Sequence, residues 1–78
     1  MPSYTLSFSE AMDALIYEDY FIQGCEFKSG IYLKVNKDNN NIVLVDANNK
    51  HSEFPLQLTT DIYKQAYRKI SIGNQAIY

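Results

Sequence analysis

A β-hairpin is encoded by residues 31–45, which read IYLKVNKDNNNIVLV. In its first half, apolar residues alternate with amphipathic ones, which predicts a half-buried strand. The apolar positions of this strand, which are expected to point inward, are Ile31, Leu33 and Val35. Residues 37–41 are polar and tolerate left-handed backbone conformations, as a hairpin turn requires. The return at 42–45 is apolar enough to predict a strand that is covered on both faces.

An amphipathic helix is expected at about residues 8–18, ahead of this hairpin. Ser7 and Glu10 have the spacing of a capping box, in which the Ser7 hydroxyl accepts from the Glu10 amide and the Glu10 carboxylate reaches back. Apolar residues then follow at helical spacing: Phe8, Ala11, Met12, Leu15 and Ile16. We expect the face that they form to be buried.

Shorter elements complete the expected fold: strands at 20–22, 51–56 and 68–72, and a helix at about 60–66. This order predicts an α+β fold, with an N-terminal helix packed on an antiparallel β-sheet and a second short helix before the last strand. A chain of 78 residues is short enough for one domain. We therefore expect residues 1–78 to form a single small domain, with an ordered core at about 6–72 and a loose tail at 73–78.

The composition argues against several classes of protein. Seven Lys and Arg against nine Asp and Glu leave a net charge of −2, so direct DNA binding is not expected. With one cysteine, Cys25, and one histidine, His51, the chain cannot form an internal disulfide or a structural zinc site. No apolar run approaches the length of a membrane span, and the N-terminus does not resemble a signal peptide. A cytoplasmic protein is the expectation.

Groups that would support catalysis are not recognisable in the sequence. Cys25 is expected to be a half-buried thiol and His51 a surface histidine, while Glu18 and Asp19 fit a solvated charge cluster better than a catalytic pair. The three glycines do not form a phosphate-binding loop. We therefore expect a binding protein that is not an enzyme and that uses no metal and no cofactor.

Aromatic residues, which make up 14% of the chain, point to self-association. Tyrosine suits interfaces because it has an apolar body and a polar tip, and small domains often gain stability by oligomerising. The sequence thus favours a homo-oligomer, either a dimer or a tetramer. The alternative is that the tyrosines fill a small core.

Two segments of the sequence resemble motifs of a known protein family. The first contains FSEAMDAL at residues 8–15 and FKSGIYL at 27–33; the second contains DIYKQAY at 61–67. Over about residues 6–72, this arrangement resembles a family of small phage proteins, the Thoeris anti-defence two family. That family shows a Phe-x-Glu-Ala-Leu-x-x-Leu helix, a Trp-Asn-Gly-x-x-Tyr-Leu region and an Asp-Leu-Leu-Ala-x-x-Trp stretch. Phe27 stands in place of the first tryptophan.

The resemblance implies a function in the host bacterial cell. Members of that family are oligomeric sponges that sequester nucleotide immune signals, such as cyclised ADP-ribose derivatives and cyclic oligonucleotides, without cleaving them. The chain is accordingly expected to be a phage anti-defence protein whose partner is a small nucleotide signal. Relatives of similar fold inhibit a CRISPR nuclease, so a protein-binding inhibitor of a host immune effector is the alternative.

Aromatic candidates for the ligand site are Phe27, Phe54 and Tyr32. Phe27 and Phe54 lie at predicted junctions between loops and strands, where a ring can leave the core and stack on a base. Tyr32 belongs to the segment that resembles the Tyr-Leu region of the family. For each phenylalanine the alternative is ordinary core packing. Because a monomer this small seldom encloses a ligand, we expect the site to lie between subunits.

Polar candidates for the ligand site could contact the phosphate and ribose groups of a nucleotide. Arg68 is the only arginine and suits a bidentate phosphate contact, with Lys28 and Lys69 as alternative cations. Thr59 and Thr60 offer hydroxyls and free amides at a helix start, and Asp61 could accept from a ribose hydroxyl or an adenine amine. The alternatives are solvated charges for the cations and simple helix capping for the threonines.

Overall fold

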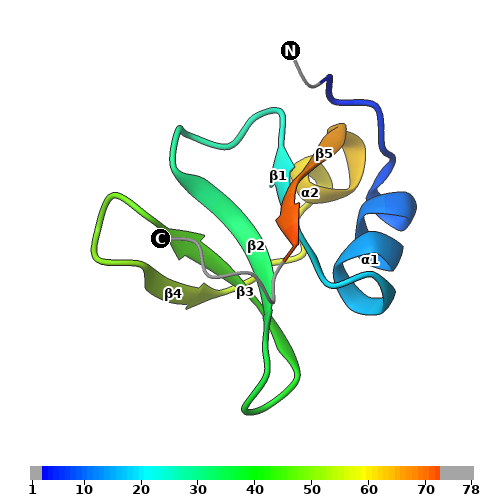
Figure 1. The fold of residues 1–78 in the computed structure, drawn as a ribbon. Helices are drawn as coiled ribbons and strands as arrows, with labels where there is room; N and C mark the ends of the chain where they lie inside the picture. The colour runs from blue at the N-terminus through cyan, green and yellow to red at the C-terminus, as the bar shows by residue number, and fades with distance from the viewer. Residues whose placement is uncertain (1–2, 73–78) are drawn as a thin grey trace.

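Residues 3–72 are described by the computed structural model, which contains two helices and five strands (Figure 1). In chain order these are α1 (Phe8–Tyr17), β1 (Tyr20–Gly24), β2 (Ile31–Asn36), β3 (Asn41–Asp46), β4 (Ser52–Pro55), α2 (Thr60–Lys64) and β5 (Tyr67–Ile72). The predicted α+β fold is confirmed, including the short helix before the last strand. The expected tail at 73–78 lies outside the described residues.

The five strands form one antiparallel sheet in the order β4-β3-β2-β1-β5. The predicted hairpin pairs Ile31 with Asp46 at one end and Asn36 with Asn41 at the other. The last strand does not extend the meander at β4, because α2 carries the chain back to the far side of the sheet, where β5 pairs with β1 (Figure 1). β4 and β5 are therefore the two edges of the sheet.

One face of the sheet is covered by helices. α1 contacts β1, β2 and β5, and α2 contacts α1. The buried cluster beneath α1 consists of Ala11, Ala14, Leu15, Ile22, Leu33 and Tyr67. The Tyr67 hydroxyl donates to the carbonyl of Ile62 in α2, which ties the second helix to the same face. We call the opposite face the helix-free face.

Two expectations about burial were wrong. Ile16 is 53% exposed, whereas Ala14 is buried. Successive residues rotate by about 100° around a helix, so a buried stripe centred on Ala11 and Leu15 includes Ala14 and leaves Ile16 at its rim. Cys25 is exposed, because it lies just beyond the end of β1, where its backbone amide donates to the carbonyl of Ala66 and its side chain lies outside the buried core cluster.

Local hydrogen bonds fix both helix starts. Ser7 Oγ accepts from the Glu10 amide at 3.2 Å, and Glu10 Oε1 accepts from the Ser7 amide at 2.8 Å, which confirms the capping box. Of the two candidate caps for α2, Thr59 is the one used, since its hydroxyl accepts from the Ile62 amide. Each helix therefore begins where the sequence predicted.

Gln65 fastens the loop between β1 and β2 to α2. Its Oε1 accepts from the Glu26 amide at 3.1 Å, and its Nε2 donates to the Asp61 carbonyl at 3.1 Å. The side chain crosses directly over Gly24, where an added Cβ would lie 2.8 Å from Gln65 Cδ. A residue without a side chain is thus required at the end of β1 for this loop to close.

Candidate functional site on the helix-free face

The register of the sheet gathers one row of side chains on the helix-free face. Gln23 pairs with Arg68 of β5. The pairing of Ile22 with Leu33 then aligns Gln23 with Tyr32 of β2. Further pairings continue the row to β4, so that it comprises Arg68, Gln23, Tyr32, Val45 and Glu53. Because residues that pair directly across a sheet share a face, this row crosses all five strands on one side.

An aromatic pair lies near the centre of this face. The rings of Phe21 and Tyr32 are stacked, with centroids 4.9 Å apart and planes inclined by 27°. Both rings are half-buried, and burial raises the pKa of the Tyr32 hydroxyl. That hydroxyl therefore keeps its proton at neutral pH and can act as a hydrogen-bond donor.

Arg68 holds a fixed position at the β5 side of the pair. Its Nε and Nη2 donate to Gln23 Oε1 at 3.0 and 2.6 Å, and its Cζ lies 4.8 Å from the centroid of the Tyr4 ring. Gln23 is itself oriented, because its Nε2 donates to the Ile31 carbonyl at 3.2 Å. The guanidinium is thus held by a neutral amide and an aromatic ring.

No ion pair among residues 3–72 includes Arg68. A guanidinium has five N–H donors, and the contacts to Gln23 occupy two of them. A held cation with free donors and no carboxylate among the described residues is well suited to a phosphate or carboxylate.

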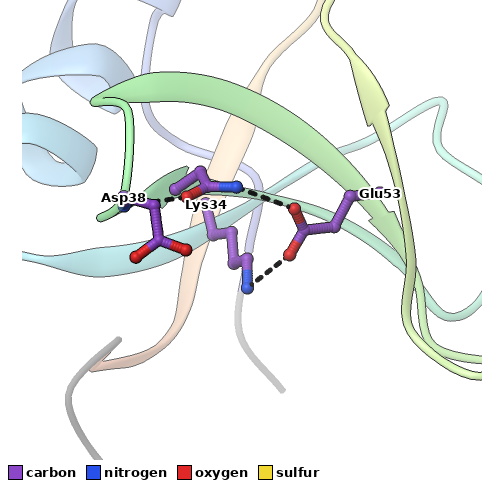
Figure 2. Close-up of polar contacts among 4 residues, drawn as sticks. Lys34, Asp38 and Glu53 are labelled. Atoms are coloured by element: carbon purple, nitrogen blue, oxygen red, sulfur yellow. Dashed lines mark hydrogen bonds and ion pairs between the residues drawn. The ribbon is translucent and has the colours of Figure 1, made fainter.

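A hydrogen-bonded chain of polar groups lies toward the β4 side (Figure 2). Lys34 Nζ lies 2.9 Å from Glu53 Oε2, and Asn36 Nδ2 donates to Glu53 Oε1 at 3.0 Å. The Asp38 amide donates in turn to Asn36 Oδ1 at 2.9 Å. The hydrogen bond from Lys34 is the main reason that the pKa of Glu53 is lowered, so this carboxyl is charged at neutral pH.

A hollow of about 370 Å³ lies between this polar chain and Phe21. Its charged lining consists of three carboxylates and two ammonium groups: Asp19, Asp38, Glu53, Lys34 and Lys37. Lys37 bonds to Asp19 at 2.8 Å, so each of the two ammonium groups is paired with a carboxylate, and Asp38 has no ion-pair partner within residues 3–72. The hollow is therefore slightly negative, and its volume lies within the usual range for small-molecule sites. Within residues 3–72, no cluster of three or more His, Cys, Asp or Glu suits a metal ion.

The two phenylalanines that the sequence singled out do not share a cleft. Phe27 is half-buried and packs edge-on against Tyr67 of β5, with ring centroids 6.2 Å apart. Phe54, on β4, is 47% exposed and is paired with Leu44, which places it on the face opposite Tyr32. Since β4 and β5 are opposite edges of the sheet, the two rings are separated by its width.

The polar candidates are also dispersed. Thr59, Thr60 and Asp61 are exposed at the start of α2, where the Thr59 hydroxyl is used as the cap. Lys28 is exposed in the loop between β1 and β2. Of the eight candidates, the structure brings only Tyr32 and Arg68 together, on the helix-free face.

Four residues that build this face were missed by the sequence reasoning: Phe21, Gln23, Lys34 and Glu53. One signal was present, because Phe21 and Gln23 alternate along one strand as Tyr32 and Lys34 alternate along the next. Alternation places each pair on one face of its strand. The alternation does not show that the strands containing Phe21 and Tyr32 are neighbours in the sheet, or that these two side chains lie on the same face of it.

Comparison of the chain with models of protein families, with curated proteins and with solved structures finds no match. Within the described residues, neither helix has the length and apolar character needed to cross a membrane. A fold alone does not determine function, which depends on the chemistry of the site.

Proposed function

We propose that this protein binds and sequesters a nucleotide immune second messenger, of the cyclised ADP-ribose or cyclic oligonucleotide type, on its helix-free face. The observation that carries the proposal is the stacked pair Phe21 and Tyr32 beside an arginine with no carboxylate partner among residues 3–72. A base stacked on an aromatic ring gains roughly 1–3 kcal/mol, and Arg68 supplies charge-assisted donors for a phosphate. The resemblance of residues 6–72 to the Thoeris anti-defence two family supports the same role.

Holding the ligand without cleaving it is part of the proposal. Hydrolysis of a nucleotide bond needs a general acid, a nucleophile or a metal at the reacting atom. Glu53 is the carboxylate on the row, and its lowered pKa makes it a poor proton donor at neutral pH. We therefore expect the bound nucleotide to be recovered unchanged.

A homo-oligomer is also proposed, and exposed apolar side chains support it. The largest of these on and near the helices are Ile16, Tyr17, Leu58 and Tyr63, which are 53%, 81%, 61% and 54% exposed. Ile16 borders a hollow of about 280 Å³ together with Val35 and Ile42, which lie on the same face of the sheet as α1. Large exposed apolar groups of this kind are typical of association surfaces.

Titration calorimetry with cyclised ADP-ribose species and with cyclic di- and trinucleotides tests the proposal. We expect heat of binding from at least one ligand, and mass spectrometry of the material released on heating should show that ligand intact. Phe21→Leu retains apolar bulk but removes a stacking ring, so it should weaken binding about tenfold, since stacking contributes roughly 1–3 kcal/mol. Phe54→Leu, on the opposite face of the sheet, is the matched control. If none of these ligands gives heat, the proposal is abandoned.

A second candidate is a protein-binding inhibitor of a bacterial immune effector such as a CRISPR nuclease. The observation that favours it is the exposure of Ile16 and Tyr17 on α1, which offers an apolar surface for a protein partner. Co-purification of a host effector, together with the absence of any bound small molecule, would select this candidate. Ile16→Asp should then abolish the co-purification.

A further inference from the structure

The charges on the helix-free face differ between its two sides. Arg68 lies on the β5 edge and has no carboxylate partner among residues 3–72, whereas Glu53 lies on the β4 edge beside a hollow with a surplus carboxylate. We infer that this face binds a nucleotide in one direction, with a phosphate at Arg68 and the amine-bearing edge of the base at Glu53. The inference rests on the proposed function and adds both an orientation and a preference for the base.

The phosphate end is assigned by charge and by preorganisation. Gln23 Oε1 holds Nε and Nη2 of Arg68, and the Tyr4 ring lies against the guanidinium. The remaining N–H groups can donate to phosphate oxygens without a carboxylate on residues 3–72 having to be displaced. Lys34 would have to leave Glu53, and Lys37 would have to leave Asp19, to provide the same contact.

The base end is assigned by the acceptors around Glu53. Among residues 3–72, each of its carboxylate oxygens receives one hydrogen bond, from Asn36 to Oε1 and from Lys34 to Oε2. A carboxylate has about four lone-pair positions, so each oxygen retains one. These positions accept from an exocyclic amine such as the N6 amine of adenine, and they repel a carbonyl oxygen in the same place. Asp38, which forms no ion pair with any cation of the described part of the chain, disfavours a phosphate there.

The distance between the two ends suits one nucleotide. Arg68 and Glu53 are four strand spacings apart, roughly 19 Å between backbones. Both side chains lean toward the middle of the sheet, since Arg68 bonds to Gln23 of β1 and Glu53 bonds to Lys34 of β2. About two spacings, or roughly 10 Å, then remain between the charged groups. Phe21 and Tyr32 lie within this interval, where a base or its sugar would pass.

Three probes and two variants test the orientation. The probes are AMP, IMP, which has a carbonyl oxygen in place of the N6 amine, and adenosine, which has no phosphate. Affinities are measured by titration of the ¹⁵N-labelled full chain in NMR spectra. For the unaltered protein we expect AMP to bind about tenfold more tightly than either other probe, since a charge-assisted contact or a matched base edge each contributes on that scale.

Each of the two variants should abolish one of these preferences and leave the other unchanged. Arg68→Gln should abolish the preference for AMP over adenosine and keep the preference for AMP over IMP. Glu53→Gln should abolish the preference for AMP over IMP and keep the preference for AMP over adenosine, because an amide can pair with either the amine or the carbonyl edge of the base. Lys64→Gln and Asp13→Asn change charge at exposed helical positions and should alter neither preference.

Two results would overturn the inference, and they are distinguishable from each other. The orientation is wrong, while the proposed nucleotide binding stands, if AMP binds but both variants weaken the binding of all three probes equally. The same holds if Arg68→Gln abolishes the preference over IMP and Glu53→Gln abolishes the preference over adenosine. If none of the probes shifts amides of β1, β2 or β5 at millimolar concentration, the orientation is wrong, and if calorimetry detects no messenger either, the proposed function fails with it.

Discussion

Lys34 and Glu53 form an ion pair across an intervening strand, with Nζ and Oε2 2.9 Å apart while β3 lies between β2 and β4. Tyr32 and Glu53 flank Val45 in the register, so the bridge runs over the apolar floor of the helix-free face. It fixes the charged edge of the candidate site at the position that the proposed base contact requires.

Removal of this ion pair should change stability only slightly at neutral pH. The two side chains are 30% and 35% exposed, and pairs in such positions contribute ~0–1 kcal/mol because water screens them. Lys34→Met should therefore lower the free energy of unfolding by less than about 1 kcal/mol, measured by urea denaturation. The difference from the unaltered protein should shrink further in 1 M salt.

The pH dependence of this difference follows from the pKa of Glu53. The folded protein lowers that pKa below its ordinary value of 4.5, so the associated stability is present above pH 4.5 and is lost as pH falls through the folded pKa. The unaltered protein and Lys34→Met should thus converge in stability below pH 4.5. A difference that grows in acid would contradict this assignment.

Tyr67 is expected to control stability at high pH. Its side chain is fully buried, and burial is the main cause that raises its pKa to about 12, with the nearby Cys25 as a further cause. The ordinary pKa is 10.0, so the stabilising contribution is present below pH 10.0 and is lost as pH rises toward 12. Tyr67→Phe should therefore flatten the fall in melting temperature between these two pH values.

The same substitution has a cost at neutral pH. The Tyr67 hydroxyl donates to the Ile62 carbonyl, and removing a buried donor leaves that acceptor unpaired at a cost of about 1–3 kcal/mol. The ring contacts to Phe8 and Phe27 would remain in Tyr67→Phe. An unchanged unfolding free energy at pH 7 would show that water replaces the lost donor.

Gly24→Ala should destabilise the protein because the new methyl group meets the Gln65 side chain. Crowding of this kind typically costs about 1–3 kcal/mol. Gln65→Ala removes the obstructing atoms and the bond to the Glu26 amide, so it should also destabilise the fold. The double variant should be less destabilised than the sum of the two single variants, because the collision with Gln65 exists only when both side chains are present, while the close contact of the new methyl group with Phe27 Cε1, at 2.9 Å, remains. Simple additivity in urea denaturation would contradict this reasoning.

Substitution by alanine should affect stability differently at Phe27 and at Phe54, the two phenylalanines that the sequence predicted for the ligand site. Phe27 packs against Tyr67 and the core cluster, so Phe27→Ala should cost about 2–4 kcal/mol of unfolding free energy. Phe54 is half-exposed on an edge strand, so Phe54→Ala should cost less than about 1 kcal/mol. Thermal denaturation of both variants measures this contrast. Equal losses would mean that Phe54 is buried by an interface in solution.

Much of the fold was predictable because the signals for it are local. The Ser7 and Glu10 spacing marked the start of α1, and the polar run at 37–41 marked the turn between β2 and β3. The interior of α1 was less predictable. Hydrophobicity favoured Ile16 over Ala14, whereas packing against the sheet selects the small residue that lets the helix approach closely.

The sequence by itself determined the elements, their order and the cap of α1, since each depends on side chains only a few positions apart. The tertiary structure alone decided the site, because Arg68 and Gln23 are separated by 45 positions and meet only when α2 returns β5 to the side of β1. Strand neighbours are determined by the joint burial of β1, β2 and β5 against α1, and no short stretch of sequence contains that information. Tyr32 and Arg68 were recognisable as chemical types, but their shared face is a property of the folded chain.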